Sequence, residues 1–108
     1  MNCEVKTIVD VTVLSLSGRL DASNSKEFED QVVKLIDSGQ KAFVANLTGL
    51  DYISSAGLRV FLLLIKKLGD KGYIHLCCLQ EQVKEVFDIS GFTSIFQIFD
   101  DEDSAVEA

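Results

Sequence analysis

Two adjacent serines, Ser54 and Ser55, stand where a polar segment meets a long apolar run. Gly57 follows closely, and the apolar residues of 58–65 are interrupted only by Arg59. A serine before an apolar helix can act as its N-cap, because the hydroxyl accepts a hydrogen bond from an unpaired amide of the first turn. A serine hydroxyl can also accept a phosphoryl group, and a helix N-terminus tolerates the added negative charge. Two hypotheses stay open: simple capping with one incidental serine, or a phosphorylation switch in which Ser55 also serves as the cap.

The glycine in the predicted first helical turn needs a reason of its own. A glycine there costs roughly 1 kcal/mol relative to alanine, and capping does not require it. We expect Gly57 to let the backbone of a partner, or the active site of a kinase, approach closely.

A second polar cluster lies in the segment SGRLDASNS, residues 17–25. Asp21, Ser23 or Asn24 can each cap the helix that follows. Alternatively, Asp21 follows a strand, lies at the same sheet edge as the two serines, and contributes its carboxylate to a shared recognition surface.

Catalytic chemistry finds little support in this chain. The serines are not in a G-x-S-x-G turn, and no HExxH, P-loop or GxGxxG pattern occurs. The single histidine, His75, is on a predicted strand away from the serines, so no base is evident for a catalytic triad. The three cysteines have no CxxC or metal-ligand spacing. We expect a protein that is not an enzyme, with no cofactor and no metal site.

The elements that must position the serines alternate between strand and helix. Two strands, 3–9 and 11–17, are rich in β-branched residues and are joined by a turn near Asp10. Apolar residues at helical spacing then predict helices between strands, with glycines at their ends. The further strands are expected at 42–47, 73–79 and 94–99, the helices at 25–38, 55–68 and 81–90, a loop at 48–54, and a last helical turn or a frayed end at 101–108.

This order, ββαβαβαβ, predicts an α/β fold with a mixed, largely parallel sheet of four or five strands and helices mainly on one face. Functional loops gather at the carboxyl ends of parallel strands, which is where the serines are expected. We expect one domain over residues 1–108, with a short acidic tail from about residue 100. The predicted core comprises Val13, Leu16, Phe28, Val32, Phe43, Val44, Phe61, Leu62, Ile65, Ile74, Leu76 and Phe87.

The net charge of −7 argues against nucleic acid or an anionic membrane as partner, because both would repel an acidic surface. A basic patch on another protein is the more plausible partner. No apolar run reaches the roughly 18 to 20 residues of a membrane span, and the N-terminus lacks the features of a secretory signal. We therefore expect a cytoplasmic protein.

Three segments resemble the STAS-domain family, and within it the bacterial anti-sigma factor antagonists. They are VLSLSGRLDASNSKEFE (13–29), FVANLTGLDYISSAGLRVFLLL (43–64) and VKEVFDISGFTSIFQIFD (83–100). The middle segment is the most specific, because the family pattern there is an apolar strand followed by a serine pair or a close variant and then Gly-Leu. The matching residues are Leu50, Ile53, Ser54, Ser55, Ala56, Gly57 and Leu58.

The resemblance implies a small cytoplasmic adaptor rather than an enzyme. In its unphosphorylated form such a protein binds an anti-sigma factor, typically a serine kinase of the histidine-kinase-like ATPase fold, and a sigma factor is released. The kinase phosphorylates one serine of the antagonist, which weakens their association. A metal-dependent serine phosphatase restores the active form.

The phosphoserine of the family falls on Ser55, and Asp21 matches its acidic position. Many members carry aspartate directly before the phosphoserine, whereas this chain has Ser54, which stays the alternative phosphorylation site. The alternative function is an unphosphorylated STAS scaffold or sensing module in a larger signalling or transport assembly. The expected partner-binding residues are Asp21, Ser23, Asn24, Ser54, Ala56, Gly57 and Arg59.

Overall fold

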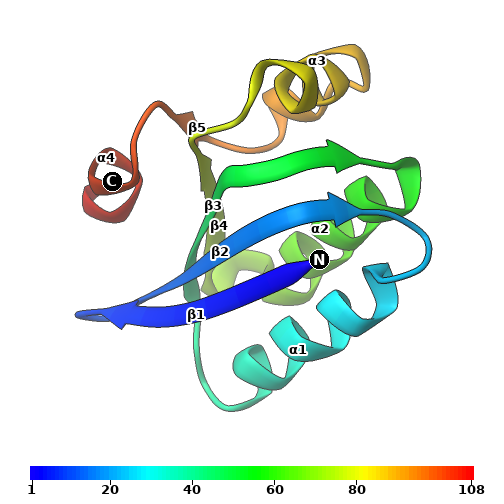
Figure 1. Cartoon of the computed structure of the whole chain (residues 1–108). Helices are drawn as coiled ribbons and strands as arrows, with labels where there is room; N and C mark the ends of the chain where they lie inside the picture. The colour runs from blue at the N-terminus through cyan, green and yellow to red at the C-terminus, as the bar shows by residue number, and fades with distance from the viewer.

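The N-terminal hairpin of the computed structural model, which describes residues 1–108, consists of β1 (Asn2–Ile8) and β2 (Val11–Leu20). These two strands are antiparallel, with Ile8 opposite Val11 at the turn. All later strands run parallel to β2, in the spatial order β1-β2-β3-β4-β5 (Figure 1). The predicted mixed, largely parallel sheet is therefore confirmed. The remaining strands are β3 (Ala42–Ile53), β4 (Tyr73–Cys77) and β5 (Ile98–Phe99).

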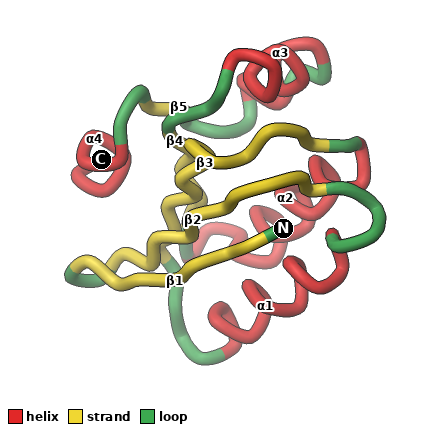
Figure 2. The backbone as a smooth tube through the Cα atoms, viewed as in Figure 1, coloured by secondary structure: helices red, strands yellow, loops and turns green.

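Three of the four α-helices pack against one face of the sheet. Helices α1 (Ser25–Asp37) and α2 (Ser55–Leu68) lie side by side under the central strands, as Figures 1 and 2 show. Helix α3 (Glu81–Ile89) joins the same core through Val83 and Phe87. The short α4 (Glu102–Glu107) lies on the other side of the sheet. Two single 3₁₀ turns, η1 (Gly69–Lys71) and η2 (Phe92–Ser94), complete the chain.

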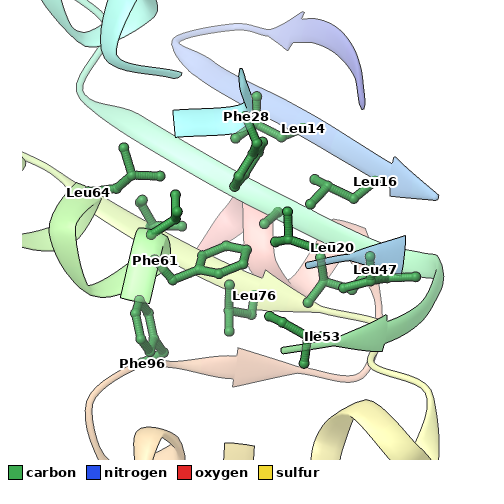
Figure 3. Close-up of a cluster of buried hydrophobic side chains, with 14 of the residues drawn as sticks. Leu14, Leu16, Leu20, Phe28, Leu47, Ile53, Phe61, Leu64, Leu76 and Phe96 are labelled. Atoms are coloured by element: carbon green, nitrogen blue, oxygen red, sulfur yellow. The ribbon is translucent and has the colours of Figure 1, made fainter. Parts of the chain in front are cut away.

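The alternation of side chains along each strand divides the buried residues between the two faces. On β3, Phe43, Ala45 and Leu47 face the large helices, whereas Val44 faces α4. Phe61 of α2 lies at the centre of the large core, with the rings of Phe28, Phe87 and Phe96 at centroid distances of 5.6, 6.2 and 6.2 Å. Figure 3 shows this side of the core, where leucines of β2, β3 and β4 surround the aromatic rings.

Two predicted core residues are wrong. Leu62 and Ile65 are only half-buried, whereas Leu64 and Leu68 are buried. Because nearly every residue of 58–65 is apolar, the pattern contains no polar face to orient α2. Packing against the sheet selects the buried face instead: Gly57, Leu58, Val60, Phe61, Leu64 and Leu68.

Three predicted element boundaries also need correction. The segment 48–54 was expected to be a loop, but β3 continues through it to Ile53 because the long β2 provides a pairing partner. The predicted strand 94–99 is reduced to Ile98–Phe99, because η2 and the buried Phe96 take up the residues before it. The first strand pair runs over 2–8 and 11–20 rather than 3–9 and 11–17.

The acidic C-terminal segment is an ordered helix that contacts the sheet. Ala105 of α4 is buried, and Glu102 bonds both the Lys6 ammonium (2.9 Å) and the Asn46 amide (3.0 Å). The Asn46 hydrogen bond, followed by that of Lys6, lowers the pKa of the Glu102 carboxyl. His75 is buried beneath α4, with its ring stacked on Tyr73 at 4.1 Å. No helix of the chain has the length and apolar character needed to span a bilayer.

Candidate functional site

The carboxyl ends of β2 and β3 lie beside each other, and this juxtaposition brings the two predicted clusters together. Leu20 of β2 pairs with Ile53 of β3. One residue further, the Ser54 amide donates a hydrogen bond to the Leu20 carbonyl oxygen at 2.9 Å. Asp21 follows Leu20 directly and Ser55 follows Ser54, so both loops leave the sheet at the same edge.

Ser54, not Ser55, is the N-cap of α2. Its backbone is extended, with φ −93° and ψ 174°, and its Oγ accepts a hydrogen bond from the Gly57 amide at 3.3 Å. Ser55 is the first helical residue, is exposed, and makes no side-chain hydrogen bond within the chain. The expectation that Ser55 also caps the helix is therefore wrong. One hydroxyl is used by the fold and the neighbouring hydroxyl is left free for chemistry.

The loop after β2 is held by hydrogen bonds among its own polar groups. Asp21 Oδ1 accepts from both the Ser23 amide (3.0 Å) and the Ser23 hydroxyl (2.6 Å). Asn24 Oδ1 accepts from the Asp21 amide (3.0 Å), and its Nδ2 donates to the Arg19 carbonyl oxygen (2.8 Å). The hydroxyl of Ser23, and then its amide, lower the pKa of the Asp21 carboxyl. Asp21 is therefore a fixed negative charge at neutral pH.

Arg19 and Tyr52 form an exposed pair that the sequence analysis missed. They are partners in the β2–β3 register, and the Arg19 guanidinium carbon lies 4.1 Å from the centroid of the Tyr52 ring. Arginine and tyrosine are enriched among the residues that dominate the binding energy of protein interfaces. The only signal in the sequence was that β3 could extend to Ile53, which would have placed Tyr52 beside Arg19.

A third loop, between β4 and α3, borders the same edge and was also missed. Gln80 Nε2 donates to the Thr48 carbonyl oxygen (2.7 Å) and lies 3.3 Å from Asp51 Oδ1. Gln82 Nε2 donates to the Asp51 carbonyl oxygen (3.3 Å) and to Gln80 Oε1 (2.8 Å). Isolated glutamines carry no sequence signal, so only the fold reveals that they fasten α3 to the end of β3.

Gly57 is buried beneath this surface. A Cβ atom at Gly57 would lie 2.9 Å from Leu20 Cγ and 2.9 Å from Ile53 Cγ1. The missing side chain therefore lets α2 press against the strand ends, a reason inside the fold rather than the external docking that was expected. Of the other predicted residues on α2, Ala56 is half-buried and Arg59 is exposed.

Replacing Gly57 with alanine is expected to destabilise the chain, although the same change in an open helix would stabilise it. Helix propensity favours alanine by about 1 kcal/mol, whereas forcing an extra methyl group into a packed site costs typically 1–3 kcal/mol. The obstructing atoms are side-chain branch points near the backbone, so the cost should prevail and stability should fall by about 1–2 kcal/mol. Urea unfolding of Gly57→Ala measures the difference. A rise in stability would show that the site has room for the methyl group.

The edge that carries the serines is an open surface. The four surface hollows of the structure are lined by residues other than Ser54, Ser55 and Asp21. No group of three or more His, Cys, Asp or Glu side chains is arranged to hold a metal ion. The geometry suits docking of a protein surface with one accessible hydroxyl near its middle.

Comparison with known proteins agrees with this geometry. The family model described as STAS domain matches residues 2–105. A Bordetella bronchiseptica protein described as an anti-sigma factor antagonist, BtrV, is 38% identical over 109 residues, covering 100% of this chain and 94% of that protein. The crystal structure of an anti-sigma factor antagonist from Mycobacterium paratuberculosis superposes with a TM-score of 0.91 at 20% identity, covering 98% of this chain and 91% of the other. SpoIIAA of Bacillus, solved in its phosphorylated form, superposes with a TM-score of 0.76 at 19% identity, covering 98% of this chain and 97% of the other.

Proposed function

This chain belongs to the STAS-domain family, and from that premise we propose that it is an anti-sigma factor antagonist whose binding is switched off by phosphorylation of Ser55. The unphosphorylated chain binds an anti-sigma factor that is also a serine kinase of the histidine-kinase-like ATPase fold, and a sigma factor is released. A metal-dependent serine phosphatase reverses the modification. The site of action is the cytoplasm, and neither nucleic acid nor a membrane is a direct partner. The chain regulates by binding and is not itself an enzyme.

The observation that carries the proposal is the different use of the two adjacent hydroxyls. Ser54 Oγ is bonded to the Gly57 amide, so its modification would remove the cap of α2. Ser55 Oγ is exposed and free of hydrogen bonds within the chain, so a kinase can reach it without disturbing the fold. This difference favours Ser55 over Ser54 as the phosphoryl acceptor.

The proposed docking surface consists of the two loops at the carboxyl ends of β2 and β3 together with the first turns of α2. Gly57 contributes by holding α2 against the strands, and Arg19 and Tyr52 extend the surface beyond the residues named from the sequence. The chain carries a net charge of −7, so a partner with a basic contact patch is favoured. The contacting residues are Arg19, Asp21, Ser23, Asn24, Tyr52, Ser54, Ala56 and Arg59.

Phosphorylation would act on the interface rather than on the fold. A phosphate adds about −1.5 to −2 charges at neutral pH, and the N-terminus of α2 is a favourable place for them. On docking, the same phosphate must lose water beside the ionised Asp21 carboxylate. An unpaired buried charge costs several kcal/mol, and each 1.4 kcal/mol weakens binding tenfold.

The test is to compare the chain carrying serine and the chain carrying genetically encoded phosphoserine at position 55. Each is titrated calorimetrically against the source organism's candidate anti-sigma kinases, purified one at a time. One kinase should bind the unmodified chain and bind the phosphoserine chain at least about tenfold more weakly. That kinase with ATP should raise the intact mass of the wild-type chain by one phosphoryl group. Equal affinities of both forms for every kinase that binds would contradict the proposed switch.

A further inference from the structure

The two edges of the sheet are treated differently by the fold. At one edge, β5 is only two residues long and is followed closely by α4. At the other edge, β1 spans Asn2–Ile8 and pairs with β2 without a register shift from Asn2 to Ile8. The chain has no proline that could interrupt this strand. A long, regular edge strand leaves a row of backbone donors and acceptors ready to pair with another strand.

From this edge we infer that the chain forms a symmetric dimer, in which β1 of one copy pairs antiparallel with β1 of a second copy. The inference goes beyond the proposed function, because it uses the edge strand and not the serine loop. Its first basis is the sequence of β1 itself, NCEVKTI. Val5 is the central residue of this strand, so a twofold axis at Val5 pairs all seven residues with a partner residue.

The charges of β1 favour the same register. With the axis at Val5, Glu4 of each copy lies opposite Lys6 of the other, and two ion pairs result. Glu4 and Lys6 are partners of Ser15 and Val13 on β2, so both side chains lie on the same face of the sheet. A shift of two residues in either direction would place Glu4 opposite Glu4 or Lys6 opposite Lys6 and would shorten the pairing. Opposite charges across a strand pair stabilise it and like charges destabilise it.

The other face of β1 borders a groove that a second strand can fill. Val5 is 43% exposed and faces the helix side, since its partner on β2 is the buried Leu14. Val5 and Leu35 contribute the apolar lining of the groove, and polar residues of α1 form its wall. Its volume is about 730 Å³, which is ample space for the valine of a second copy and its neighbours on the strand.

The charge of this edge is balanced, although the chain as a whole is acidic. The edge and the wall of the groove carry three lysines (Lys6, Lys26, Lys34) and three acids (Glu4, Glu27, Asp30). The net charge of the whole chain is −7. Two copies would therefore repel one another over most of their surface, whereas this edge carries no excess charge to oppose their approach.

A charge-swap experiment on the full chain tests the dimer. Sedimentation equilibrium measures the dissociation constant of the wild type, Glu4→Lys, Lys6→Glu and an equimolar mixture of the two variants. The wild type should approach twice the monomer mass of 11.9 kDa as its concentration rises. Each single variant should dimerise at least about tenfold more weakly, because both cross-strand pairs become repulsive. The mixture should dimerise again, because the lysines of one variant face the glutamates of the other.

Matched controls separate the edge from general charge effects and from damage to the fold. Glu85→Lys and Lys84→Glu make the same charge changes on exposed residues of α3 and should dimerise as the wild type does. Lys6→Glu also loses its ion pair with Glu102, and recovery in the mixture would show that this loss does not explain its weaker association. The inference is overturned if the wild type stays monomeric at its solubility limit, if Glu4→Lys associates like Glu85→Lys, or if the mixture stays monomeric.

Discussion

Ser55→Ala is expected to take up no phosphate and to bind the anti-sigma kinase whether or not ATP is present. Ser55 is exposed and its hydroxyl makes no hydrogen bond within the chain, so its removal should leave the fold intact. Incubation with kinase and ATP, followed by intact-mass measurement, should show one added phosphoryl group on the wild type and none on the variant. Calorimetry should then show unchanged affinity for Ser55→Ala and a loss of about tenfold or more for the modified wild type.

Ser54→Ala is the matched control, because it removes the neighbouring hydroxyl. It should still be phosphorylated. It should also be less stable by about 0.5–2 kcal/mol, since the hydrogen bond from the Gly57 amide to the cap is lost. The opposite pattern, with phosphate on Ser55→Ala and none on Ser54→Ala, would move the switch to Ser54.

Ser55→Asp offers a second check on the electrostatic explanation. It should weaken kinase binding, but by less than phosphoserine does, because one carboxylate carries less charge and fewer acceptor oxygens than a phosphate. Raising the salt concentration should narrow the difference between Ser55→Asp and the wild type, because salt screens exposed charges. A difference that does not depend on salt would indicate a steric rather than an electrostatic block.

Phe61→Ala is expected to lower the free energy of unfolding by about 3–5 kcal/mol. The Phe61 side chain is fully buried where rings from α1, α3 and the segment before β5 converge (Figure 3). Truncation loses the burial of the ring and leaves a cavity among neighbours that cannot all move inward. Since small domains are stable by only about 5–15 kcal/mol, this variant should be close to unfolding at ambient temperature. Urea denaturation followed by circular dichroism measures the change.

Leu63→Ala on the same helix is the control for Phe61→Ala. Leu63 is 44% exposed, so its truncation should cost less than about 1 kcal/mol. Equal losses for the two variants would mean that the face of α2 that contacts the sheet is not the one described.

Much of the fold could be predicted from local pattern, because propensity and periodicity act over a few residues. The β-branched residues of the first 17 positions, the glycines that end the helices and the apolar spacing of α1 were enough to establish the order of elements. The parallel arrangement followed from strands separated by helices. The neighbourhood of the two serine-containing loops followed as well, since the carboxyl ends of parallel strands share one edge of the sheet.

The sequence by itself thus determined the fold class and the two loops that form the candidate site, whereas only the tertiary structure decided which atoms do what within it. Ser54 and Ser55 are identical in type, and only the position of the Gly57 amide makes Ser54 the cap. The reason for glycine at position 57 became visible only when Leu20, 37 positions earlier, was brought against it. Likewise, the run 58–65 could not show that Leu64 is buried and Leu62 is not. These choices depend on residues far apart in the chain, and no local pattern records which distant atoms will be in contact.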